Sequence, residues 1–168
     1  MKTTLVLTIL GADRMGLVGS VADCVAAHGG SWQESRMARL AGQFAGILRV
    51  ECPTPNREGL EEDLHALKNL GLTVMIVHDP SEDADERGIL DLEITGLDEP
   101  GIVKRITNTL TGMGANVEDW HTSLESAPMA GHLLFCTRGK VRVPDDLTPA
   151  QLIESLEVVG AGLTVDVR

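Results

Sequence analysis

The chain has 168 residues, a length that allows one large domain or two small ones. Hydrophobic residues make up 43% of it, and its formal net charge is −11. Binding to nucleic acid needs clustered basic residues, and the longest basic run is Lys104-Arg105, so we expect no direct nucleic-acid binding. The first residues lack the pattern of a secretory signal, and no apolar run is long enough to span a membrane. We therefore expect a cytoplasmic protein that does not bind membranes.

The first half predicts six elements in chain order. "TLVLTI" at 4–9 alternates as in a strand, and Leu17, Val21 and Val25, together with Val18, have helical spacing. Strands are expected at 31–40 and 44–52, joined by a turn at 41–43. A second helix carries Leu60, Leu64 and Leu67, and "LTVMIV" at 72–77 predicts a last strand.

The second half repeats this pattern 85 residues later. Identical pairs include Gly11/Gly96, Asp13/Asp98 and Gly16/Gly101, and "ILDLEI" at 89–94 repeats the first strand. Further strands are expected at 116–125, 129–138 and 163–167, and helices are predicted around Ile102–Met113 and after Thr148, where Gln151 completes a capping box. The last strands of the two halves, at 72–77 and 163–167, are separated by 91 residues instead of 85. We attribute the six additional residues to an insertion near "RGKVRVPDD" at 138–146.

The order β-α-β-β-α-β, present twice, predicts an α+β protein. We expect two ferredoxin-like βαββαβ domains, each an antiparallel sheet with helices on one face. The polar segment "DPSEDADERG" at 79–88 has the composition of a linker. The predicted organisation is therefore a domain at 1–80, an acidic linker at 81–88 and a second domain at 89–168.

The corner after the first strand of each repeat resembles the ACT domain family of small-molecule regulatory modules. "DEPG" at 98–101 and "ANVED" at 115–119 are close to the most recurrent pattern of that family. The first repeat departs from it at Met15, where the family usually has proline, and at Ser31-Trp32, where it usually has asparagine and an aliphatic residue. Two such domains in tandem resemble the glycine cleavage system transcriptional repressor group.

The chemistry of the corner suits an amino acid. Amides at a helix N-terminus lack intrahelical partners and attract a carboxylate, glycine allows close approach, and Pro100 is expected to set the φ of the first turn. Asp13 or Asp98 could accept the ligand's ammonium, and Asn116 could bind its backbone atoms. Equally, either aspartate could cap its helix, the glycines could serve packing, and Asn116 could be a turn residue.

The candidate ligand-binding residues form two sets. The second repeat, ranked first because it keeps more of the family pattern, contributes Asp98, Glu99, Pro100, Gly101, Ile102 and Asn116. The first repeat contributes Asp13, Arg14, Met15, Gly16, Leu17 and Ser31.

These features favour a regulatory protein over an enzyme. We expect it to bind a small amino acid such as glycine or serine, to form a homodimer, and to affect gene expression or metabolism through a protein partner. No metal, cofactor or catalytic residue is expected. The alternative is an assembly module without a small ligand, with residues 138–148 as a docking loop. A hydrolytic or redox enzyme using Cys24 or His121 is disfavoured, because no nucleophile, base and oxyanion hole are evident as a set.

Overall fold

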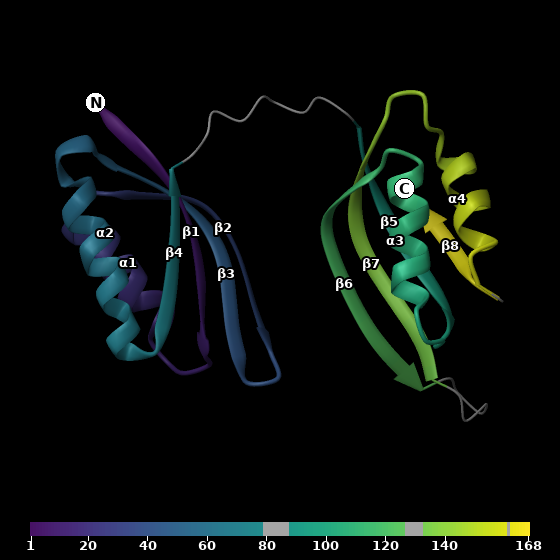
Figure 1. Ribbon diagram of the computed structural model, residues 1–168, viewed down its shortest axis with the longest axis horizontal. Helices are drawn as coiled ribbons and strands as arrows, with labels where there is room; N and C mark the ends of the chain where they lie inside the picture. The colour runs from purple at the N-terminus through teal and green to yellow at the C-terminus, as the bar shows by residue number, and fades with distance from the viewer. Residues whose placement is uncertain (79–87, 127–132, 161) are drawn as a thin grey trace. The chain divides into compact units, whose positions relative to one another are not determined.

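The computed structural model describes residues 1–78, 88–126, 133–160 and 162–168 (Figure 1). The chain divides into two compact units, Met1–Asp83 and Ala84–Arg168. The finer limits that the sequence predicts, including the linker at 81–88, fall almost entirely on residues 79–87, outside the described residues. They stay predictions; the first strand of the second unit begins at Gly88.

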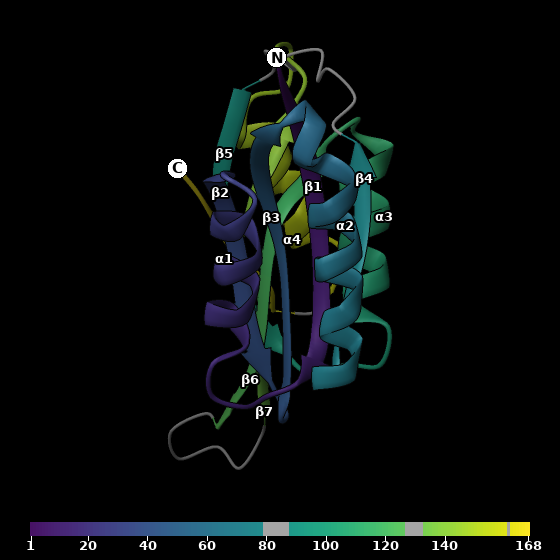
Figure 2. The ribbon, with the colours of Figure 1, turned by 90° about the vertical axis from the view of Figure 1, so that its left-hand side faces the viewer.

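The first unit has the predicted order of elements. They are β1 (Lys2–Ala12), α1 (Leu17–Ala27), β2 (Ser31–Leu40), β3 (Gln43–Pro53), α2 (Arg57–Ala66) and β4 (Leu72–His78), with short 3-10 turns at Thr54–Asn56 and Leu67–Leu70. The antiparallel sheet has the order β2-β3-β1-β4. Figure 2 shows α1 and α2 lying across one face of this sheet.

The second unit repeats this topology. Its elements are β5 (Gly88–Leu97), α3 (Ile102–Gly112), β6 (Asn116–Ser126), β7 (Leu133–Val143), α4 (Pro149–Glu157) and β8 (Thr164–Val167). The sheet order is β6-β7-β5-β8, again antiparallel. The chain therefore has the predicted α+β fold of two ferredoxin-like units. Among the helices of the described residues, none is both long and apolar enough to cross a bilayer.

Each unit has its own aliphatic core between sheet and helices. The inward side chains of β1, namely Leu5, Leu7 and Ile9, are fully buried beneath Leu17, Val21 and Val25 of α1, as their spacing predicts. The second core is built in the same way, from Leu92 and Ile94 of β5 and Ile102, Ile106 and Leu110 of α3. Val18 differs from expectation: it lies one position off the buried stripe and is 40% exposed.

The capping box at α4 is confirmed. The Thr148 side chain accepts a hydrogen bond from the Gln151 amide at 3.3 Å, and the Gln151 side chain accepts one from the Thr148 amide at 2.9 Å. Pro149 occupies the first helical position, where its missing N–H has no intrahelical role. These contacts fix the start of the helix that follows β7.

The insertion lies earlier in the chain than the sequence indicates. Leu7 pairs with Leu48 in the first sheet, and Leu92, which is 85 residues beyond Leu7, pairs with Gly139, which is 91 residues beyond Leu48. Glu34 and Asp119, on the preceding strands, still differ by 85. The six additional residues therefore fall between β6 and β7, that is, between 126 and 133.

The placement of the insertion at 138–146 was therefore wrong. Residues 138–143 belong to β7, where Val141 and Val143 point into the core while Arg138 and Lys140 face solvent. This charged alternation is that of a half-exposed strand, although its polarity resembles that of a loop. The docking loop expected at 138–148 reduces to 144–148.

Gly139 offers a direct test of the bulge in β6. The register shifts between Val117 and Asp119, and a Cβ on Gly139 would overlap the Asp119 carbonyl oxygen. We expect Gly139→Ala to lower the free energy of unfolding by about 1–3 kcal/mol, because backbone must move. Gly112→Ala, with open space at the end of α3, is the matched control and should raise it by up to about 1 kcal/mol.

Urea unfolding followed by circular dichroism measures both changes. Equal unfolding midpoints for the two variants would show that the bulge accommodates a methyl group, and the close approach at Gly139 would then have no energetic consequence.

Candidate functional site

The corner of the second unit is a tight turn rather than the first turn of a helix. The Ile102 amide donates a hydrogen bond to the Glu99 carbonyl at 3.1 Å, and Gly101 has φ 82° and ψ 9°. These angles are those of the third residue of a type II turn, whose second position favours proline. Pro100 therefore shapes the turn before α3 and does not set the φ of its first turn, contrary to expectation.

Both helices start without a side-chain cap. Gly16 and Gly101 are the N-cap residues of α1 and α3, both are left-handed, and neither helix has a side-chain cap hydrogen bond. Asp13 and Asp98 are therefore not N-caps, which removes the capping alternative. The amides of each first turn that no side chain caps remain a positive electrostatic site. In the first unit the proline position is taken by Met15, which is fully exposed.

The two corner aspartates differ in their surroundings. The Asp13 carboxylate forms an ion pair with Arg39, and the Asp13 amide donates to the Gly42 carbonyl at 2.8 Å. The Asp98 amide donates to the Leu133 carbonyl at 3.1 Å, which ties the corner to β7. Within the described residues the exposed Asp98 carboxylate has no hydrogen-bond or ion-pair partner. Only Asp98 is thus open to an incoming cation without breaking an existing pair.

The other corner residues hold the turn in place. The Glu99 carboxylate accepts a hydrogen bond from Arg105 at 2.7 Å, and Arg105 also donates to the Val159 carbonyl at 3.2 Å and the Pro100 carbonyl at 3.3 Å. Glu99 therefore braces the corner against α3. In the first unit the Arg14 guanidinium lies beside Gly71, just before β4.

Leu17 and Ile102 contribute only backbone to the two corners. Their side chains are 5% and 4% exposed and belong to the two cores. A ligand would therefore not meet these side chains, and in the second corner the Ile102 amide is already bonded to the Glu99 carbonyl.

Asn116 does not lie at the corner of its own unit. It begins β6 and pairs with Arg142, which pairs in turn with Ile89 near the start of β5, whereas the corner follows Leu97 at the other end. Eight residues separate these ends, roughly 27 Å at about 3.4 Å per residue. Ser31 is placed likewise at the start of β2. The helix carries the chain back along the sheet, and the next strand therefore begins far from the corner.

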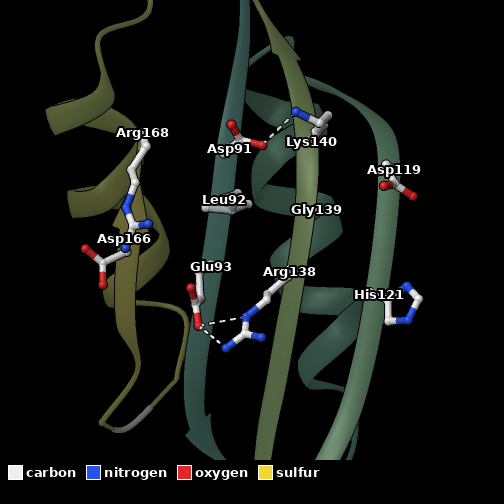
Figure 3. A pocket seen from close by; sticks show the side chains of 10 residues that line it. All are labelled: Asp91, Leu92, Glu93, Asp119, His121, Arg138, Gly139, Lys140, Asp166 and Arg168. Atoms are coloured by element: carbon white, nitrogen blue, oxygen red, sulfur yellow. Dashed lines mark hydrogen bonds and ion pairs between the residues drawn. The ribbon is translucent and has the colours of Figure 1, made fainter.

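The structure has a pocket elsewhere in the second unit. It has a volume of about 350 Å³ and lies on the helix-free face of the sheet, lined by charged residues of β5, β7 and β8 and by Asp119 and His121 of β6 (Figure 3). The sequence pointed to two of these residues for other reasons: His121 as a disfavoured catalytic residue, and Asp119 as part of the ACT-like pattern at 115–119. The sequence signal for this pocket was charge at every second position, at Asp91 and Glu93 and again at Arg138 and Lys140. Residues two apart in a strand point to the same face of the sheet.

The first unit matches a known protein family. Residues 3–77 match the ACT domain family. The first unit is an ACT domain. The second unit shares its topology and its glycine corner, so the chain has the fold of two ACT-type domains. No curated protein sequence matches the chain significantly.

Two solved structures resemble the tandem ACT fold over the whole chain. An unknown protein from Galdieria sulphuraria is 27% identical, with a TM-score of 0.83, and the alignment covers 100% of this chain and 98% of that one. A protein described as a "putative glycine cleavage system transcriptional repressor" is 18% identical, with a TM-score of 0.70 and the same coverages. At this identity the second likeness shows the fold alone.

Cys24 lies in the first ACT domain in surroundings that disfavour a nucleophile. Burial, and then the carboxylates of Asp63 and Asp23, raise the pKa of its thiol above the ordinary value. One turn further along α1, His28 Nε2 lies 2.8 Å from the Asp63 carboxylate, so that histidine is engaged in joining α1 to α2. Burial likewise raises the pKa of the Cys52 thiol. Thiols held protonated in this way have a packing role.

The raised pKa makes a testable prediction for alkylation. Because the thiolate is the reactive form, Cys24 in the folded protein should react with iodoacetamide more slowly than an unhindered thiol at neutral pH, and its rate should rise only above the ordinary thiol pKa. Peptide mass spectrometry across a pH series measures this rate, with urea-unfolded protein as the control. A midpoint at or below the ordinary pKa would show an activated thiol.

Proposed function

We propose that the protein is a regulatory sensor of a small amino acid such as glycine or serine, bound at the corner formed by residues 98–102. One observation carries the proposal: the N-terminus of α3 has no side-chain cap and stands next to the exposed Asp98 carboxylate, which has no partner among the described residues. A zwitterion needs this pair of opposite charges. The ACT domain match of the first unit and the shared fold support it.

The two ends of the ligand would be bound by different groups. Its carboxylate would accept hydrogen bonds from the Val103 and Lys104 amides, aided by the helix dipole, because the Ile102 amide is already bonded to the Glu99 carbonyl. Its ammonium would be held by Asp98. Glycine has about five heavy atoms, and at roughly −1.5 kcal/mol per atom the binding free energy reaches at best about −7.5 kcal/mol, which corresponds to a micromolar dissociation constant. Such an affinity suits a sensor of an abundant metabolite.

Asn116 and the first corner take different places in this proposal. Because Asn116 lies at the far end of its own sheet, it would contact this ligand only from a second copy of the chain, as sites of ACT proteins often form across interfaces. In the first corner the Asp13 carboxylate is already paired with Arg39, so we place the principal site in the second unit and a weaker one at Asp13–Leu17, with Ser31 in the role of Asn116.

The signal would pass through a protein partner in the cytoplasm. The chain has no basic cluster for nucleic acid, and its three cysteines are free thiols. A role in gene expression would agree with the name of the repressor-like neighbour, with which the chain shares its fold.

Thermal unfolding against the twenty amino acids tests the proposal. A ligand at 100 times its dissociation constant stabilises the folded state by about 2.7 kcal/mol, which raises the midpoint by several degrees. We expect glycine or serine to produce this shift. Asp98→Asn should abolish it, because the ammonium loses its charged partner.

The controls separate the corners. Asp145→Asn, an exposed change in the loop before α4, should keep the full shift, and Asp13→Asn should keep most of it. A shift that survives in Asp98→Asn would place the site elsewhere. No shift with any amino acid would contradict the sensor and leave the assembly module as the explanation.

A further inference from the structure

The helix-free face of the second sheet carries an ordered set of charges, which we call the charged face. Strand pairing aligns its side chains in two rows across β6, β7, β5 and β8 (Figure 3). The first row is Asp119, Lys140, Asp91 and Arg168, and the second is His121, Arg138, Glu93 and Asp166. Signs alternate along the first row and divide into a basic and an acidic half in the second.

The central side chains are already held in place. Lys140 Nζ lies 2.9 Å from the Asp91 carboxylate, and Arg138 donates to one oxygen of Glu93 at 2.8 and 2.9 Å. All four remain substantially exposed, with Arg138 at 75%. Their positions therefore require little further ordering before a partner arrives.

These charges are not a requirement of the fold. The equivalent positions on the first sheet are Val6 and Thr8 on β1, Met75 and Val77 on β4, Ile47 and Arg49 on β3, and Glu34 and Arg36 on β2. That sheet forms with uncharged residues at all the equivalent positions of β1 and β4. The charged face is also nearly neutral as a whole, although the chain carries −11. A balanced patch on an acidic protein is a place where two copies can approach without net repulsion.

A small ligand is a poorer occupant of this face. Sites for small molecules are enclosed and mostly apolar, with a few unpaired polar groups. Here the pocket lies open on the sheet, and its central charges neutralise one another (Figure 3). The arrangement suits a flat surface with its own charge pattern.

We propose that the charged face is the contact surface for a second copy of the chain, stacked face to face. The symmetry axis would run parallel to the strands, between β7 and β5. Rotation about it places β7 over β5 and β6 over β8 of the partner. Lys140 then faces a partner copy of Asp91, and Arg138 a partner copy of Glu93, each twice. The outer pairs, Asp119 with Arg168 and His121 with Asp166, are also complementary.

The two rows on the corner side satisfy the same symmetry. Cys136 pairs in register with Thr95, and Leu134 with Leu97, on the same face of the sheet. The rotation places each of these residues over the partner copy of the residue with which it pairs. Cys136 then faces a partner copy of Thr95, and Leu134 a partner copy of Leu97. Leu97 is 45% exposed and would be covered. On the central strands β5 and β7, four successive rows are therefore self-complementary under one operation, as an isologous interface requires.

The expected dimer is modest in strength. Four strands at about 4.8 Å spacing and four rows along them cover roughly 20 by 25 Å, so the stacked pair buries about 1,000 Å² in total, near the lower limit for specific interfaces. At its centre, Lys140 and Asp91 of the two copies form a square of alternating charge, in which each ion has two neighbours of opposite sign. Arg138 and Glu93 form a second such square. We expect a reversible dimer that weakens as salt shortens the Debye length from about 10 Å at 0.1 M to about 3 Å at 1 M.

Sedimentation velocity over a range of chain concentrations tests this contact without any ligand, and so independently of the amino-acid site. Two reversed variants are needed: an acidic one, Arg138→Glu with Lys140→Glu, and a basic one, Asp91→Lys with Glu93→Lys. Each should raise the dissociation constant of its own dimer at least about tenfold, because like charges then face each other. An equal mixture of the two should form a heterodimer.

The mixture distinguishes an intermolecular contact from a loss of folding, since a misfolded variant is not rescued by its partner. Lys104→Glu, a charge reversal on the exposed side of α3, is the matched control and should leave dimerisation unchanged. A wild-type chain that stays monomeric at millimolar concentration in low salt would overturn the proposal. A dimer that is insensitive to both reversed variants, or a mixture that forms no heterodimer, would overturn it as well.

Discussion

Both units depend on the absence of a side chain at the end of their central strand. A Cβ on Gly11 would meet the Gly71 carbonyl, and one on Gly96 would meet the Leu163 side chain, so β1 and β5 can approach the segments that lead into β4 and β8 only as glycine. Immediately beyond, Gly16 and Gly101 turn the chain into a helix through a left-handed backbone. The position of each helix over its sheet, and hence the exposed amides of each corner, follows from these closely spaced glycines.

Local patterns predicted most of the fold. The alternation at Leu5, Leu7 and Ile9 and the helical spacing of Ile102, Ile106 and Leu110 reflect burial, which the structure confirms. What escaped prediction depends on strand register. The identical pairs Phe44/Phe135 and Val50/Val141, at a separation of 91, indicate the correct alignment of β3 with β7, but a gap-free comparison at 85 hides them. Register is set by hairpin length, and a six-residue change in one hairpin moves every cross-strand neighbour.

The candidate site divides in the same way. The corner residues 98–102 are consecutive, so their proximity could be predicted from the sequence, as could the helix N-terminus behind them. Asn116 is also close in sequence, yet α3 carries the chain to the opposite end of the sheet before β6 begins. The charged face was missed because its members are distant in sequence and meet only through pairing. The corner and the charged face lie on different parts of the unit, so sensing and self-association need not compete for the same residues.

The unequal outer faces also bear on how a duplicated chain folds correctly. The buried residues of β4 and of the segment that contains β8 are nearly interchangeable, so burial alone would let either strand complete either sheet. They are Leu72 and Val74 in the first unit, and Leu163, just before β8, and Val165 in the second. Misassembly between similar neighbouring units is a characteristic failure of such chains. An exchanged β4 would set Met75 beside Glu93, where β8 sets Asp166, and would leave Asp91 without Arg168 beside it. Charge on the solvent side of the second sheet therefore favours its own edge strand over the duplicate, a choice that burial alone would leave open.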